Sequence, residues 1–187
     1  MRILLALPLA LAALPALADD ICHEAWFLRN LNFDRAGYCF GTALGQAVFD
    51  NADCTGKQVT LGPEATRHVA AVKEFEDWFG CKVNTAQTRL DVPHAAMLRR
   101  LESLPVPTDT GSGCMGYNGV PFDVYAGPRE TAAVLARVKQ GDNITWEYTH
   151  VSVEGWGIVA ISDARGLIAI GWSSAPVRDP DCDLVAG

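Results

Sequence analysis

Six cysteines are the feature of this 187-residue chain that most restricts how it folds. An even number of cysteines in an exported protein is typical of a disulfide framework, because oxidising compartments allow thiols to pair. Disulfides also stabilise segments that are too short to bury much apolar surface. The positions that we expect to form three disulfides are Cys22, Cys39, Cys54, Cys81, Cys114 and Cys182.

The amino terminus, residues 1–18, has the pattern of a secretory signal peptide. Arg2 supplies a positive charge, residues 3–18 form an unbroken apolar run, and Ala16-Leu17-Ala18 is an A-x-A cleavage pattern. The run is shorter than the ~20 apolar residues that span a bilayer. We therefore expect cleavage near Ala18, no membrane-spanning segment, and a mature protein that is periplasmic or secreted.

The charge pattern restricts the kinds of partner. The formal net charge is -7 at pH 7, and the 15 lysines and arginines never form a run of five. Binding to phosphate backbones needs clustered basic side chains, so we expect no nucleic-acid partner. The apolar fraction of 49% is that of an ordinary globular protein.

Residues 19–82 are predicted to form a small helical domain. Apolar spacing predicts a helix over 20–36 and one or two helical turns over 43–49. The clearest helix begins with Pro63 in its first turn and ends near Phe79, before a glycine. The domain therefore has three helical segments joined by two loops.

The order of these helices predicts how four of the cysteines pair. If the first and third helices are antiparallel, Cys22 at the start of one lies beside Cys81 at the end of the other. Cys39 and Cys54 bracket the middle turn. We therefore expect the disulfides Cys22–Cys81 and Cys39–Cys54, of which the one closing the smaller loop contributes ~3 kcal/mol on the chain-entropy model.

Residues 83–113 are predicted to be a linker that contains one helix. Apolar residues from Pro93 through Leu104 predict the helix. From Pro105 to Gly113 the chain is rich in proline, threonine, serine and glycine, a composition typical of linkers. We therefore place the domain boundary in this segment.

Residues 114–187 change to a β pattern, with short apolar runs separated by turn residues. Five such runs predict a small barrel, and Cys114 before the first is expected to pair with Cys182 after the last. The expected fold class is therefore α+β: a disulfide-stapled helical domain followed by a five-stranded barrel, each with its own small core. The predicted strands are 120–125, 134–138, 144–153, 156–161 and 167–172.

Several short motifs in the second half are shared with a known fold. In chain order they are Asp123-Val124-Tyr125-Ala126-Gly127-Pro128, Val134-Leu135-Ala136-Arg137-Val138, Gly141-Asp142, Gly155-Trp156 and Gly171-Trp172. With these motifs the chain resembles the bacterial Src-homology-3-like domains of cell-envelope proteins. The resemblance implies an SH3-like barrel.

The first half resembles the YARHG domain, a small extracellular bacterial module. The matching residues are Leu28-Arg29-Asn30, the run from Phe33 to Tyr38, Phe40 and Phe49. The five residues that give the domain its name read Phe33-Asp34-Arg35-Ala36-Gly37 here, with phenylalanine for tyrosine and alanine for histidine. The two halves together resemble a family of exported bacterial proteins of unknown function.

Polar residues in the YARHG-like segment are the first candidate site. Arg29, Asn30 and Arg35 lie among aromatic residues, where a semi-buried arginine has to be satisfied by carbonyls or a carboxylate. One interpretation is structural, with Asn30 and Arg35 holding the loop that contains Tyr38 and Cys39. The other is a socket for an anion or carboxylate.

Aromatic residues of the predicted barrel are the second candidate site. Such residues line grooves that accept extended peptides, and they also fill small barrel cores. We expect Trp172 and Trp156 to be partly structural. The candidate groove residues are Tyr125, Trp146, Tyr148 and Trp156.

Catalytic and metal-binding functions have weaker support. No Cys-x-x-Cys pair or closely spaced histidine pair is present, so we expect no metal or cofactor. His23 and His68 are interpreted as surface residues, and Glu74, Glu76 and Asp77 as a solvated helix face. We expect a non-catalytic binding protein that contacts peptidoglycan or an envelope protein. The alternatives are a small hydrolase that uses a cysteine or carboxylate, and a secreted inhibitor of a foreign enzyme.

Overall fold

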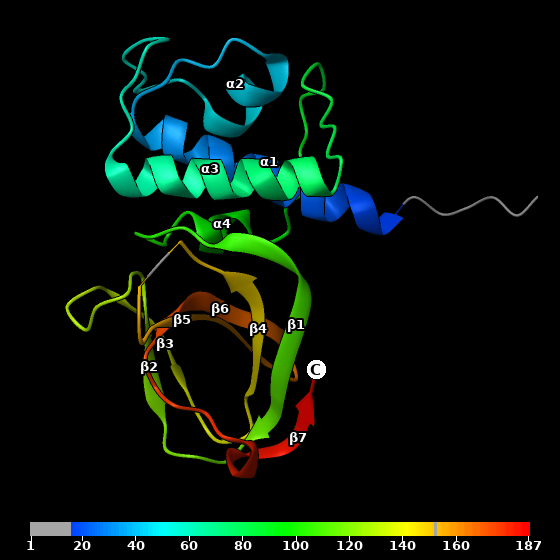
Figure 1. The fold of residues 1–187 in the computed structure, drawn as a ribbon, viewed down its shortest axis with the longest axis vertical. Coiled ribbons are helices and arrows are strands. Elements are labelled where there is room, and N and C mark those ends of the chain that lie inside the picture. The colour runs from blue at the N-terminus through cyan, green and yellow to red at the C-terminus, as the bar shows by residue number, and fades with distance from the viewer. Residues whose placement is uncertain (1–15, 152) are drawn as a thin grey trace, which may run out of the picture.

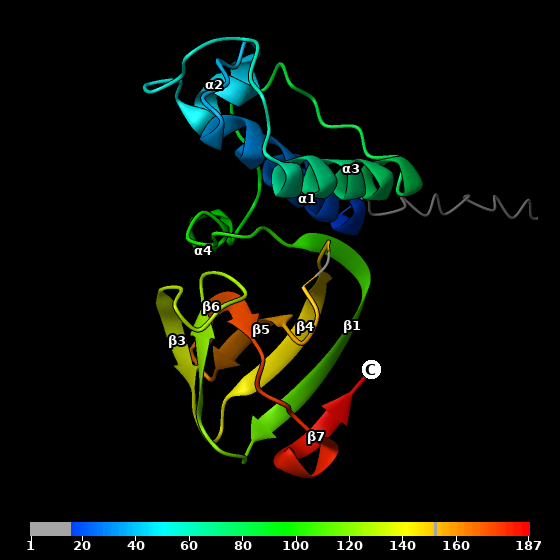
Figure 2. The same cartoon turned by 60° about the vertical axis from the view of Figure 1, so that its left-hand side comes forward.

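The computed structural model of the chain describes residues 16–151 and 153–187 (Figure 1). A layer of helices lies above a curled antiparallel sheet, and a short helix lies between the two layers in both views (Figure 2). The helices are α1 (Ala16–Arg35), α2 (Ala43–Phe49), α3 (Pro63–Trp78) and the short α4 (Ala95–Leu98). No helix in the described part of the chain is both long and apolar enough to cross a bilayer.

Local sequence signals explain the helix ends. The Thr42 side chain accepts a hydrogen bond from the Gly45 amide and caps α2, and Pro63 occupies the first turn of α3. After α1 the chain turns through Gly37, whose φ of 81° favours glycine. The helices predicted over 43–49 and from Pro63 are confirmed.

All three predicted disulfides are confirmed. Cys22–Cys81 joins the start of α1 to the chain just after α3, and the two Cα atoms are 5.3 Å apart. Cys39–Cys54 closes the loop that contains α2, and Cys114–Cys182 joins two strands of the sheet.

In the described part of the chain, seven strands form one antiparallel sheet in the order β3-β2-β6-β5-β4-β1-β7. The sheet curls around a cluster of buried residues that includes Val124, Val138 and Ile161. The strands are β1 (Val106–Tyr117), β2 (Phe122–Tyr125), β3 (Val134–Val138), β4 (Asn143–Thr149), β5 (Gly157–Asp163), β6 (Gly166–Ser173) and β7 (Cys182–Ala186).

The expected five-stranded barrel is wrong in strand number and closure. The sheet is open, because β3 and β7 each have a strand on one side only. Strand β1 begins at Val106 and occupies the last part of the segment that was predicted as a linker, and β7 follows the last predicted strand. Proline, aspartate and glycine in β1 hide its β character, and its pairing is long-range, for example Gly113 with Thr145 and Ala186. An SH3-like domain is not shown.

The predicted helix from Pro93 through Leu104 is also too long. Helix α4 ends at Leu98, and the chain then continues without helix into β1. Leu101 and Leu104 are buried, so this extended segment places apolar side chains between the helices and the sheet. Burial in this layer outweighs the local preference for helix.

A large apolar cluster joins the two layers, in contrast to the two separate cores that were expected, and the sheet keeps a second cluster of its own. Phe27 and Leu31 of α1 belong to the same cluster as Ile158 of β5 and Trp172 of β6. Leu101 lies in it as well, with 1% of its surface exposed. The helices therefore cover apolar residues of β5 and β6 that lie outside the cluster within the curled sheet.

Candidate functional site

The end of α1 is bound to the chain that leads into the sheet. The Arg35 guanidinium donates hydrogen bonds to the carbonyl oxygens of Arg99 (3.2 Å), Leu101 (2.6 Å) and Glu102 (3.3 Å). Among the described residues, no carboxylate lies within ion-pair distance of it. Burial lowers the pKa of Arg35, and the nearby Asp34 opposes that shift. Arg35 is thus satisfied by carbonyls but does not hold the loop of Tyr38 and Cys39.

A buried hydrogen-bond chain lies next to Arg35. Asn32 Nδ2 donates to His68 Nδ1 (2.8 Å), and His68 Nε2 lies 2.8 Å from the Pro105 carbonyl oxygen. A carbonyl can only accept, so Nε2 carries the proton and His68 is neutral. Burial lowers the pKa of His68.

The interpretation of His68 as a surface residue is wrong, because it is 2% exposed. The spacing of His68 along the helix indicates that it is buried. His68 precedes the buried Val72 by four residues and therefore lies on the same face of α3. Sequence reasoning also missed Asn32, which is 8% exposed.

Asn32 and His68 also line a cleft of about 440 Å³, which we call the junction cleft. Its lining residues come from the end of α1, the first turn of α3 with the residues before it, and the segment that enters β1. Arg35 contributes a positive charge and Glu64 a negative one, and the carboxylate of Glu102 is ion-paired with Arg129. A smaller cavity of about 100 Å³ also has Glu64 and Leu104 in its wall, so the two are neighbours.

The far wall of the smaller cavity belongs to the sheet. His150 and Trp172 line it, with ring centroids 5.1 Å apart. The Trp172 indole donates a hydrogen bond to the Ser103 carbonyl (2.9 Å). Trp172 is therefore structural, as expected, and its hydrogen bond holds the segment around Ser103 between the helices and the sheet.

The other YARHG-like candidates lie elsewhere on α1 and the following loop. Arg29 pairs with Glu76 of α3 at 2.7 Å, and the Asn30 amide donates to the Trp26 carbonyl of its own helix. The Tyr38 ring packs edge-on against Phe40, with centroids 5.1 Å apart. The structure therefore does not bring Arg29, Asn30 and Arg35 into one socket.

The aromatic candidates of the sheet do not share one groove. Tyr125 packs edge-on against Trp156, with centroids 5.8 Å apart. Trp146 packs instead against the cluster inside the curled sheet. The Tyr148 hydroxyl donates to Glu24 of α1 (2.7 Å), which is a second polar contact between the layers. Burial raises the pKa values of both Glu24 and Tyr148.

The cysteines and carboxylates considered for catalysis have other roles in the structure. All six cysteines form disulfides, so none has a free thiol to act as a nucleophile. The carboxylate of Glu76 is paired with Arg29, whereas Glu74 and Asp77 line an open surface beside the exposed Trp78. Within residues 16–151 and 153–187, no group of three or more potential ligands is placed to hold a metal ion.

Comparison with protein families divides the chain close to the junction cleft. The YARHG domain matches residues 1–77, and a domain of unknown function, DUF4453, matches residues 80–187. No curated protein and no solved structure matched the chain. The cleft is lined from both matched segments, because Arg35 and Glu64 belong to the first and Glu102 to the second.

Proposed function

The chain belongs to the DUF4453 family, and from this premise we propose that it is an exported, non-catalytic binding protein of the bacterial cell envelope. YARHG domains are typically extracellular, and three disulfides fit an oxidising compartment. The proposed signal peptide supports export, although most of it lies outside the described residues. Its proposed cleavage site, near Ala18, falls in the first turn of α1.

The observation that carries this proposal is the position of the family-signature residues. Arg35 and Ala36, two of the five residues that correspond to the YARHG name, both line the junction cleft. Ala36 stands where the domain has histidine, so the cleft lacks a side chain there that could act as an acid or base.

The charges of the cleft favour a ligand that carries both signs. The three carbonyl oxygens bound by Arg35 carry no charge, so they do not neutralise its guanidinium. The guanidinium has further N–H groups that can donate to a ligand carboxylate. Glu64 lies on the same cleft and can pair with an amino group, whereas Glu102 is already ion-paired with Arg129. Peptidoglycan stem peptides carry both carboxylates and amino groups, so we propose them as the ligand.

Sedimentation with purified sacculi tests this function. The Ala65→Trp variant places an indole in the cleft wall, and Ala47→Trp makes the same change on an exposed part of α2. We expect the wild type and Ala47→Trp to sediment with sacculi and Ala65→Trp to stay in the supernatant. If the wild type does not sediment, or if all three proteins sediment equally, the proposal is wrong.

A further inference from the structure

We propose that the outer face of β1 carries a second binding surface, which docks an extended polypeptide segment through a basic side chain. The surface is built from two neighbouring cavities of about 360 Å³ and 210 Å³, which share Gly111 and Glu147 in their walls. We call it the β1 furrow. It is separate from the junction cleft and adds a protein partner to the proposed wall-binding role.

An irregular stretch of β1 creates the furrow. Pro107 pairs with Tyr148 and Ser112 pairs with Trp146, so residues 108–111 stand opposite Glu147 alone. Such bulges bend a strand and are common next to functional sites. The bulged residues form a wall of the larger cavity, which reaches Glu24 of α1.

Small residues form the floor of the furrow. The register places Thr145, Gly113 and Ala186 side by side on β4, β1 and β7. Gly111 lies two residues before Gly113, and consecutive side chains on one face of an extended strand have this same spacing. The Met115 side chain lies against Gly113, so the open part of the floor is at Gly111. Next to the floor, Leu184 of β7 is 62% exposed and offers an apolar contact.

The wall of the furrow is acidic. Glu24 and Asp109 line the larger cavity, and Glu147 lines both. Of the described residues that line the two cavities, none is a lysine or arginine. Burial raises the pKa of Glu24, whose carboxylate already accepts a hydrogen bond from the Tyr148 hydroxyl, so the negative charge of the wall comes mainly from Asp109 and Glu147. A lysine or arginine side chain complements these charges, which is why we infer a basic partner.

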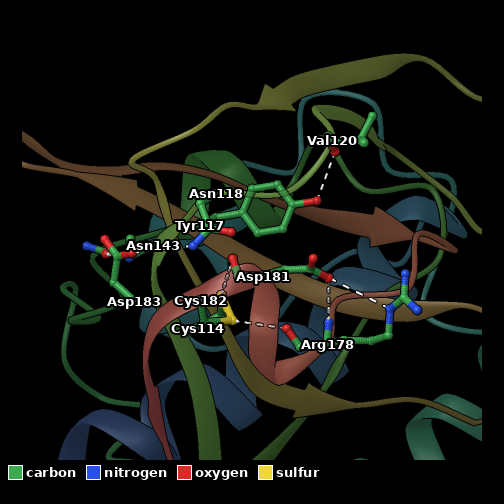
Figure 3. The surroundings of a disulfide bond; sticks show 10 residues. Cys114, Tyr117, Asn118, Val120, Asn143, Arg178, Asp181, Cys182 and Asp183 are labelled. Carbon is green, nitrogen blue, oxygen red and sulfur yellow. Dashed lines mark hydrogen bonds and ion pairs between the residues drawn. A yellow bond between two sulfur atoms is a disulfide. The ribbon is translucent and has the colours of Figure 1, made fainter.

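The β7 side of the furrow is held rigidly. Figure 3 shows the Cys114–Cys182 disulfide and the turn of 3-10 helix (Asp179–Asp181) that precedes β7. The backbone N–H of Asn118 donates to the Asp181 carbonyl (2.8 Å), and the backbone N–H of Arg178 donates to the Asp181 carboxylate (3.1 Å). A surface fixed in this way loses little conformational entropy when a partner binds.

Fluorescence anisotropy with a labelled peptide of alternating lysine and valine tests the furrow. Gly111→Leu fills the floor, because a Cβ at Gly111 meets no atom closer than 3.5 Å. Gly157→Leu is the matched control, since a Cβ there meets nothing within 4 Å. We expect about tenfold weaker binding for Gly111→Leu and unchanged binding for Gly157→Leu.

A pair of charge reversals separates docking from general attraction to an acidic protein. We expect Glu147→Lys to weaken peptide binding about tenfold, and Glu130→Lys, an exposed site near β3, to change it less than twofold. Equal losses in both variants, equal binding to Gly111→Leu and wild type, or no binding to the wild type would overturn the proposal. Gly111→Leu should still sediment with sacculi, so failure of the furrow and failure of the cleft are distinguishable.

Discussion

Arg35 Nη2 donates a hydrogen bond to the Leu101 carbonyl over 2.6 Å, although the two residues are 66 positions apart. The bond ties the last turn of α1 to the segment that enters the sheet. An arginine of the YARHG-like segment is thus bound to the backbone of the DUF4453 segment. This contact makes the two segments depend on each other for stability.

Arg35→Gln is expected to lower the free energy of unfolding by about 2 kcal/mol, because hydrogen bonds from a charged donor are lost. Urea unfolding measures the change. Arg165→Gln serves as the control, since that side chain is 89% exposed and its change should leave the urea midpoint nearly unaltered. Equal midpoints for the two variants would show that the Arg35 contacts contribute nothing to stability.

His68 is expected to make the protein less stable in mild acid. Its pKa is lowered by burial from the ordinary 6.5, so the unfolded chain takes up a proton at a higher pH than the native protein. Stability should therefore fall as the pH drops below about 6.5. Urea midpoints measured from neutral to acid pH for wild type and His68→Gln check this, since the variant should lose that part of the slope. Parallel curves would argue against a neutral, buried His68.

Glu24→Gln is expected to stabilise the protein at neutral pH. Burial raises the pKa of Glu24 above its ordinary 4.5, so the native state holds the proton more tightly than the unfolded state does. The stability from this group is complete below pH 4.5 and is lost as the pH rises through the native pKa. Glutamine keeps an oxygen for the Tyr148 hydroxyl. The thermal midpoint of the variant should exceed that of wild type at neutral pH and approach it in acid; a lower midpoint at neutral pH would contradict the assignment.

Leu101→Ala is expected to destabilise the helices and the sheet together, by about 3 kcal/mol. Leu101 is 1% exposed and lies in the cluster shared by both layers. Helical circular dichroism and hydrogen exchange in β5 should report a single unfolding transition, shifted to lower denaturant. Leu184→Ala, at a side chain that is 62% exposed, is the control. Two separate transitions would show that the layers fold independently.

Local signals in the sequence predicted the first three helices and the disulfides. Cysteine pairing followed from helix order, because antiparallel helices bring Cys22 to Cys81 whatever their side chains pack against. The same local signals failed at β1, whose residues resemble a linker and become a strand only by pairing with β4 and β7. Pairing over such separations leaves no local pattern in the sequence.

The candidate site was predictable in part. The sequence indicated that Arg35 needs carbonyl or carboxylate partners, and the structure supplies three carbonyls. It could not indicate which ones, because the partners lie 64 to 67 residues away. The aromatic groove was not formed because Tyr148 turns toward α1 and Trp146 packs into the sheet. Both outcomes depend on how the two layers meet.

Titration calorimetry with soluble peptidoglycan fragments, released from sacculi with their stem peptides intact, tests most directly whether the junction cleft is a binding site. We expect saturable binding of one fragment per molecule of wild type and of Ala47→Trp. Binding should be lost in Ala65→Trp, whose indole occupies the cleft wall. No binding to the wild type, or equal affinity for Ala65→Trp and wild type, would contradict the proposed function.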